Sequence, residues 1–116
     1  MTLTFDQLRS TNLSRCKRWH PGGVDDWSLA DWGVAMAGEA GEVCDIIKKL
    51  NRCRDNLIGN RRNEEELKRD LALEIADTIL YLDLLAARAD INIEDAVTKK
   101  FNAVSERLNF PERLPE

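Results

Sequence analysis

Hydrophobic residues recur every three or four positions along most of the chain, and this spacing predicts α-helices rather than β-strands. Breaks rich in glycine, proline and asparagine divide the pattern into segments. The predicted helices run from Phe5 to Trp19, from Ser28 to about Asn51, from Asn63 to about Ala89, and from Ile93 to about Leu108. Since no segment alternates as a strand does, the sequence predicts an all-α fold, with residues 1–116 forming one domain.

The second predicted helix carries acidic residues where its apolar stripe calls for hydrophobic ones. Glu39 stands on the stripe between Met36 and Val43, and Glu42 follows Glu39 by three residues. Residues three apart leave a helix from similar sides. This helix therefore presents a pair of carboxylates along the face expected to pack against a neighbour.

The third predicted helix repeats this arrangement. Glu74 stands on the ridge that contains Leu71 and Thr78, and Asp77 follows on the neighbouring ridge. Burying carboxylates without partners is strongly unfavourable, so a positive charge should lie among the four acids. Ligands that are all oxygen favour a hard cation, Mg²⁺ first and Mn²⁺ as its substitute. The alternative is that the acids are solvated surface residues, as most acid pairs on helices are.

These segments resemble the ExxE and ExxD motifs of the all-α NTP pyrophosphatases, the superfamily of MazG, the dimeric dUTPases and dCTP pyrophosphatase. The resemblance rests on the sequence GEAGEV at Gly38 to Val43, on the lysines that follow it, and on EIADTILYL at Glu74 to Leu82. It continues into the sequence KKFN at Lys99 to Asn102, and it covers roughly Trp27 to Arg107, most of the chain.

The resemblance implies a four-to-five-helix MazG-like bundle that assembles into a homodimer or homotetramer. It implies hydrolysis of a nucleoside triphosphate, with deoxynucleotides favoured, to the monophosphate and pyrophosphate. The role would be house-cleaning or control of the dNTP pool. The catalytic and Mg²⁺-binding residues would be Glu39, Glu42, Glu74 and Asp77.

Other residues are candidates for substrate contacts. The candidate phosphate-binding bases are Lys48, Lys49, Arg54, Lys100 and Arg107. The candidate base- and sugar-binding residues are Trp32, Tyr81, Asn102 and His20. Each of these residues has an alternative role without a ligand: an exposed lysine or arginine, an aromatic residue of the core, or a packing contact. The loop from Arg52 to Asn63 aligns with no motif and receives no role.

The composition narrows the classes of function. The net charge is −4 and no basic run dominates, which argues against nucleic acid as the main partner. No apolar run is long enough to span a bilayer, and the first residues lack a secretory pattern, so a cytoplasmic protein is expected. One histidine, and three cysteines without CxxC spacing, predict neither a zinc site nor a disulfide framework.

Two other functions compete with the hydrolase. The first is a helical dimerisation or nucleotide-binding module without catalysis, against which the intact set of four acids argues. The second is a carboxylate-bridged di-metal redox protein, which the lack of ExxH motifs makes remote.

Overall fold

The computed structural model describes residues 2–116, and every regular element among them is helical. The α-helices are α1 (Phe5–Cys16), α2 (Leu29–Arg54), α3 (Glu64–Arg88) and α4 (Ile93–Arg107), and a 3₁₀ turn, η1, spans Gly23–Asp26. The predicted all-α class is therefore confirmed for the described residues. Within the same residues, no helix combines the length and the apolar character needed to cross a membrane.

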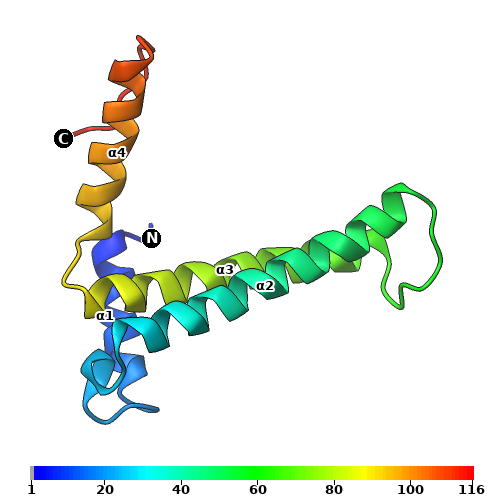
Figure 1. Cartoon of the computed structure of the whole chain (residues 1–116), viewed down its shortest axis with the longest axis horizontal. Helices are drawn as coiled ribbons and strands as arrows, with labels where there is room; N and C mark the ends of the chain where they lie inside the picture. The colour runs from blue at the N-terminus through cyan, green and yellow to red at the C-terminus, as the bar shows by residue number, and fades with distance from the viewer. Residues whose placement is uncertain (1) are drawn as a thin grey trace.

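The long helices α2 and α3 lie side by side as a hairpin, which is the main packing unit of the chain (Figure 1). Helix α1 and turn η1 pack against α3 near the end of the hairpin where α2 begins and α3 ends. The loop between α2 and α3 lies at the opposite end, and α4 projects away from the hairpin (Figure 1).

The ends of the helices follow local sequence signals. Thr4, Ser28 and Asn63 each accept a hydrogen bond from the backbone three residues ahead and so begin α1, α2 and α3 with a capping box. After α2, α3 and α4 the chain turns at Asn56, Asp90 and Asn109, all three with φ of 56 to 57°. Asparagine and aspartate tolerate this left-handed conformation better than other non-glycine residues, so they close the helices as glycine commonly does.

Two helix ends differ from the sequence prediction. Helix α1 ends at Cys16 rather than Trp19, because the next residues form tighter turns: the Trp19 amide donates to the Cys16 carbonyl at 3.1 Å. Pro21 disfavours helix in the residue before it and so prevents these turns from continuing as helix. Helix α2 runs to Arg54, about one turn beyond the predicted end at Asn51.

A buried carboxylate joins α1 to α3. Asp83 is only 2% exposed and accepts two hydrogen bonds from α1, from Arg9 Nε at 2.8 Å and from Asn12 Nδ2 at 3.1 Å. The Arg9 guanidinium also donates to the Ile91 carbonyl, and the Asn12 amide also donates to the Leu80 carbonyl. Beside this network Cys16, Trp32 and Leu84 form a small buried core, so the polar and apolar contacts together fix α1.

We expect Asp83→Ala to lower the free energy of unfolding by about 3 kcal/mol or more, because the change leaves Arg9 and Asn12 without their buried acceptor. Urea unfolding monitored by circular dichroism measures the change. The control is Asp55→Ala, which removes an exposed ion pair with Arg54 and should cost less than about 1 kcal/mol. Equal losses in the two variants would show that the Asp83 network does not anchor α1.

Candidate functional site

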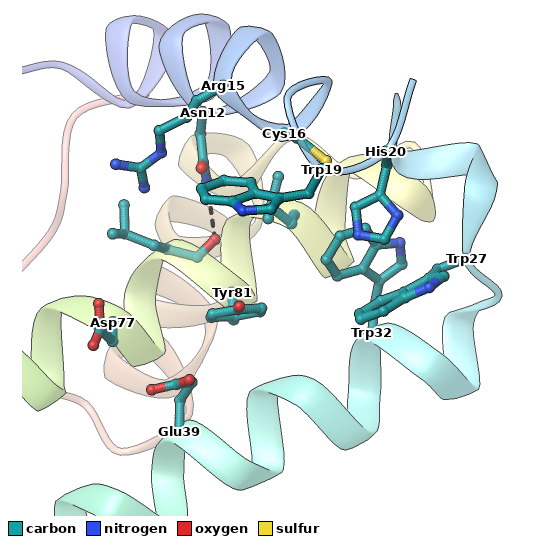
Figure 2. A pocket seen from close by; sticks show the side chains of 12 residues that line it. Asn12, Arg15, Cys16, Trp19, His20, Trp27, Trp32, Glu39, Asp77 and Tyr81 are labelled. Carbon is teal, nitrogen blue, oxygen red and sulfur yellow. Dashed lines mark hydrogen bonds between the residues drawn. The ribbon is translucent and has the colours of Figure 1, made fainter. Parts of the chain in front are cut away.

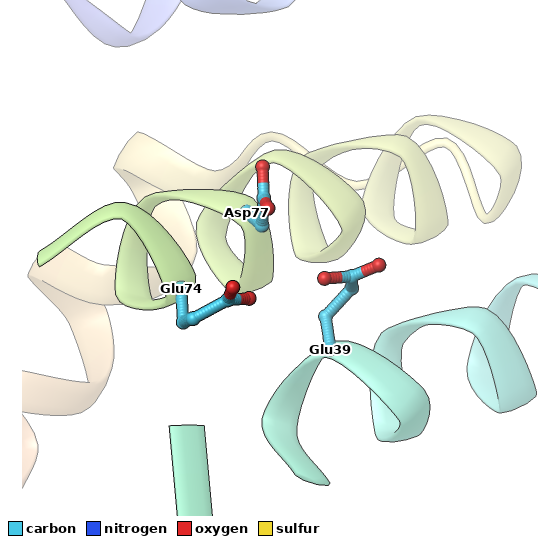
Figure 3. Close-up of side chains that lie close together, drawn as sticks. All are labelled: Glu39, Glu74 and Asp77. Carbon is cyan, nitrogen blue, oxygen red and sulfur yellow. The ribbon is translucent and has the colours of Figure 1, made fainter. Parts of the chain in front are cut away.

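Three of the predicted acids meet across the seam between α2 and α3. Glu39 on α2 and Glu74 and Asp77 on α3 each offer a carboxylate oxygen, and these oxygens lie within 4.8 Å of one another (Figure 3). The prediction that the acids of the two helices face each other is therefore met for these three residues, which we call the acidic cluster. Glu39 and Glu74 are half-buried, and Asp77 is exposed.

The acidic cluster is electrostatically unfavourable without a cation. Partial burial raises the pKa of Glu39, and the charges of Asp77, Glu74 and Glu42 raise it further. Partial burial likewise raises the pKa of Glu74, followed by the charges of Asp77, Glu42 and Asp70. Glu42 thus acts on the cluster through its charge, although its carboxylate is not among the three whose oxygens converge.

The donor set of the acidic cluster suits a divalent cation. Three carboxylates supply only oxygen ligands, which Mg²⁺ and Mn²⁺ prefer, and Mg²⁺ commonly retains several waters. A cation would remove the repulsion that raises the pKa of Glu39 and Glu74. A protein with three carboxylate ligands and water in the remaining positions could hold a polyphosphate through the same ion.

A cavity of about 570 Å³ lies next to the acidic cluster, between α1 and the hairpin (Figure 2). Glu39 and Asp77 lie at one end of this cavity with Tyr81 beside them, and His20, Trp27 and Trp32 gather at the other (Figure 2). We call it the aromatic cavity, after Trp19, His20, Trp27, Trp32 and Tyr81, which line it. Its volume is within the range of small-molecule sites, about 300–1,000 Å³.

The aromatic residues pack against one another as well as lining the cavity. The ring centroids of His20 and Trp27 are 4.5 Å apart, and those of Trp27 and Trp32 are 4.7 Å apart. Trp32 is 2% exposed, and its indole Nε1 donates to the Val24 carbonyl at 2.8 Å. Trp32 is therefore mainly a core residue that supports the cavity wall, whereas Trp19 is 69% exposed and has a face available to a ligand.

Of the predicted base- and sugar-binding residues, His20, Trp32 and Tyr81 line the aromatic cavity and Asn102 does not. The Asn102 amide instead fixes the C-terminal tail on α4: its Nδ2 donates to the Leu114 carbonyl at 2.9 Å, and its Oδ1 accepts from the Leu114 amide at 2.7 Å. Within one chain Asn102 therefore has a structural role.

The predicted phosphate-binding bases do not line the aromatic cavity within a single chain. Lys48 and Lys49 both pair with Asp45, at 3.4 and 3.0 Å, and Arg54 pairs with Asp55 at 2.8 Å. Lys100 and Arg107 belong to α4, which projects from the hairpin (Figure 1). A role for any of these five bases in binding phosphate stays a prediction.

Helix α1 contributes two polar residues to the cavity, Asn12 and Arg15, that were not among the predicted site residues. Arg15 is exposed, its guanidinium carbon lies 5.8 Å from the centre of the Trp19 ring, and it forms no ion pair with the acids of residues 2–116. The sequence does contain a signal for Asn12. Leu8, Asn12 and Cys16 are spaced by four residues, so Asn12 is a polar residue on an apolar helix face, as Glu39 is on α2. No local pattern distinguishes Arg15 from a surface arginine.

These features define an all-helical protein with an acidic cluster at the mouth of an aromatic cavity. No protein-family model matches the sequence. The sequence is similar to the "Gene 37 protein" of Mycobacterium phage L5, with 28% identity over 74 residues, which cover 64% of this chain and 60% of the phage protein. The chain thus spans about three fifths of the length of that relative, whose name states no activity.

We expect Glu39→Gln to unfold at higher urea concentration than the wild type at pH 7 in the presence of a chelator. A carboxyl with a higher pKa in the folded than in the unfolded protein binds its proton more tightly when folded. The wild type therefore loses stability as the pH rises from the ordinary glutamate pKa through the raised one, and the glutamine variant does not. The stability gain of Glu39→Gln over the wild type should be absent near pH 4 and present at about pH 7, because the Glu39 carboxyl titrates between these values.

Glu65→Gln is the matched control, because the Glu65 side chain is 85% exposed on the same helix as Glu74. This control should show no such gain with rising pH. A Glu39→Gln variant that is no more stable than the wild type at pH 7 would rule out a like-charge conflict in the cluster.

Proposed function

We propose that this protein is a Mg²⁺-dependent nucleoside triphosphate pyrophosphohydrolase of the MazG-like kind. The observation that carries the proposal is the position of Glu39 and Asp77, which belong both to the acidic cluster and to the wall of the aromatic cavity. A nucleotide has the same two parts, a polyphosphate that needs cations and a planar base that needs an apolar surface. The resemblance of the acidic motifs to those of the all-α NTP pyrophosphatases supports the same function.

In the proposed reaction, water adds to the α-phosphorus and the bond from that phosphorus to the bridging oxygen breaks. The products are the nucleoside monophosphate and pyrophosphate, and the proton of the water passes to a carboxylate of the seam. Bound Mg²⁺ would supply charge neutralisation for the triphosphate. Glu39, Glu74 and Asp77 would hold the ion, with Glu42 beside them, and the protein would provide positioning rather than a covalent intermediate.

The aromatic cavity suggests how the rest of the nucleotide is held. The exposed face of Trp19 and the ring of Tyr81 offer surfaces on which a base can stack. Arg15 is the basic residue that α1 contributes to the cavity wall, and its guanidinium is available to donate to a phosphate oxygen. Deoxynucleotides are our proposed substrates, by analogy with the small enzymes that the sequence resembles.

We also propose that the chain forms a homo-oligomer, because one chain leaves large apolar faces uncovered. Ile75, Ile79 and Leu82 lie along one face of α3 and are 44%, 48% and 41% exposed. On α4, Val97 and Phe101 share a face and are 43% and 44% exposed. These faces extend over two helices, and covering them with a second copy would enlarge the small buried core of the single chain.

The glycines of α2 support the same assembly. A side chain added at Gly38 or Gly41 would meet no atom within 4 Å in the described chain, so packing within residues 2–116 does not require glycine there. Glycine inside a helix costs about 1 kcal/mol relative to alanine. Close approach of a second copy or of the substrate would explain why this cost is tolerated.

The function is tested by measuring pyrophosphate release from the standard dNTPs and NTPs with Mg²⁺. We expect release that is lost with a chelator and that falls about 100-fold or more in Glu39→Gln and in Asp77→Asn, because each change removes a ligand charge. Glu65→Gln, with the same chemical change on an exposed side chain, should retain the rate.

The outcome separates the hydrolase from a binding module. Nucleotide binding without pyrophosphate release would favour the non-catalytic module. Release that is unchanged in both cluster variants would show that the acidic cluster is not the catalytic site.

The assembly is tested by analytical ultracentrifugation of Ile79→Asp. We expect the wild type to sediment as a dimer or tetramer and the variant as a smaller species, because a charge in an apolar interface must be desolvated. Ile58→Asp is the matched control, since Ile58 is 97% exposed in the loop between α2 and α3. A wild type that sediments as a single chain would refute the proposed assembly.

A further inference from the structure

A second cavity, opposite in charge to the acidic cluster, lies at the loop end of the hairpin. It has a volume of about 350 Å³ and is formed by the last turns of α2, the start of α3 and the connecting loop. We call it the basic cavity, because four of its wall residues are bases and none is an acid: Lys49, Arg52, Arg61 and Arg62. The net charge of the whole chain is −4, so this concentration of positive charge is local.

The bases of this cavity are not equally neutralised by neighbouring acids. Lys49 pairs with Asp45 at 3.0 Å, and Arg62 makes two contacts with Asp70, from Nε at 2.6 Å and from Nη2 at 3.1 Å. Arg52 and Arg61 form no ion pair with the acids of residues 2–116. Two guanidinium groups therefore border the cavity with their charges uncompensated.

The cavity wall is built rather than formed by chance contacts of surface side chains. Asn60 bridges the loop to α2, because its Nδ2 donates to the Lys49 carbonyl at 2.7 Å and to Cys53 Sγ at 3.4 Å. The bond to the carbonyl fixes the orientation of the amide, and it leaves Asn60 Oδ1 buried with no hydrogen-bond partner in the described chain. Buried acceptors without partners are rare and costly, and buried water is the usual donor to such a group.

We propose that the basic cavity is a second anion site, separate from the acidic cluster, that binds a phosphate-class oxyanion such as inorganic phosphate or pyrophosphate. Arg52 and Arg61 would donate to its oxygens, as guanidinium groups do in phosphate sites. Lys49 is paired with Asp45, and Arg62 with Asp70 and Glu66, so Arg52 and Arg61 carry the uncompensated charge of the site.

The test is isothermal titration of the whole protein with inorganic phosphate and with pyrophosphate, in a chelator and at constant ionic strength. No nucleotide or metal is present, so the result does not depend on the proposed hydrolase activity. We expect saturable binding that weakens about tenfold or more in Arg52→Gln and in Arg61→Gln, because each loses charge-assisted hydrogen bonds. A preference between the two anions shows whether one phosphate or a diphosphate is the better ligand.

Arg69→Gln is the matched control. This substitution removes the same charge near the same end of α3. Arg69 does not line the cavity, and it pairs with Glu65 on the surface. Equal weakening in all three variants would mean a general charge effect and would overturn the proposal. No binding of either anion, or binding of an oligonucleotide alone, would overturn it too, and circular dichroism confirms that each variant is folded.

Discussion

The contact between Asp83 and α1 is the interaction on which the candidate site depends. Helices α2 and α3 can pack against each other through their apolar ridges without help, but they do not form the aromatic cavity by themselves. The cavity exists because α1 crosses their end, and Arg9 and Asn12 hold α1 there by donating to a carboxylate that is 2% exposed. Asn12 also lines the cavity, so the same side chain that anchors α1 forms part of the binding surface.

The Asp83 network and the acidic cluster differ in how their charge is balanced. Asp83 has an arginine and an amide within hydrogen-bond distance, so its charge is compensated inside the chain. Partial burial raises the pKa values of Glu39 and Glu74, and neighbouring acids, Asp77 and Glu42 for both, raise them further. A structural network satisfies its own charges, whereas a site for a cation keeps a charge that only the ligand can balance.

Features encoded within one helix could be predicted from the sequence, and features that join distant segments could not. The capping residues Thr4, Ser28 and Asn63 and the acids interrupting the apolar stripes are local patterns, and the structure agrees with them. The bond between Arg9 and Asp83 spans 74 residues of sequence, and no periodicity reveals it. The spacing of four residues between Asp45 and Lys49 predicts their ion pair on a helix. The sequence does not show whether Lys49 binds Asp45 or a phosphate.

The basic cavity shows why the sequence predicted no role for the loop between α2 and α3. Its arginines are scattered over the end of α2 and the loop, and only the fold brings them together. Lys49 follows Glu39 by ten positions on α2, which corresponds to about 15 Å along the helix. This separation exceeds the screening length of about 8 Å at physiological ionic strength. The acidic cluster and the basic cavity therefore do not neutralise each other, so the proposed cation site at the seam and the proposed anion site at the tip are electrostatically compatible.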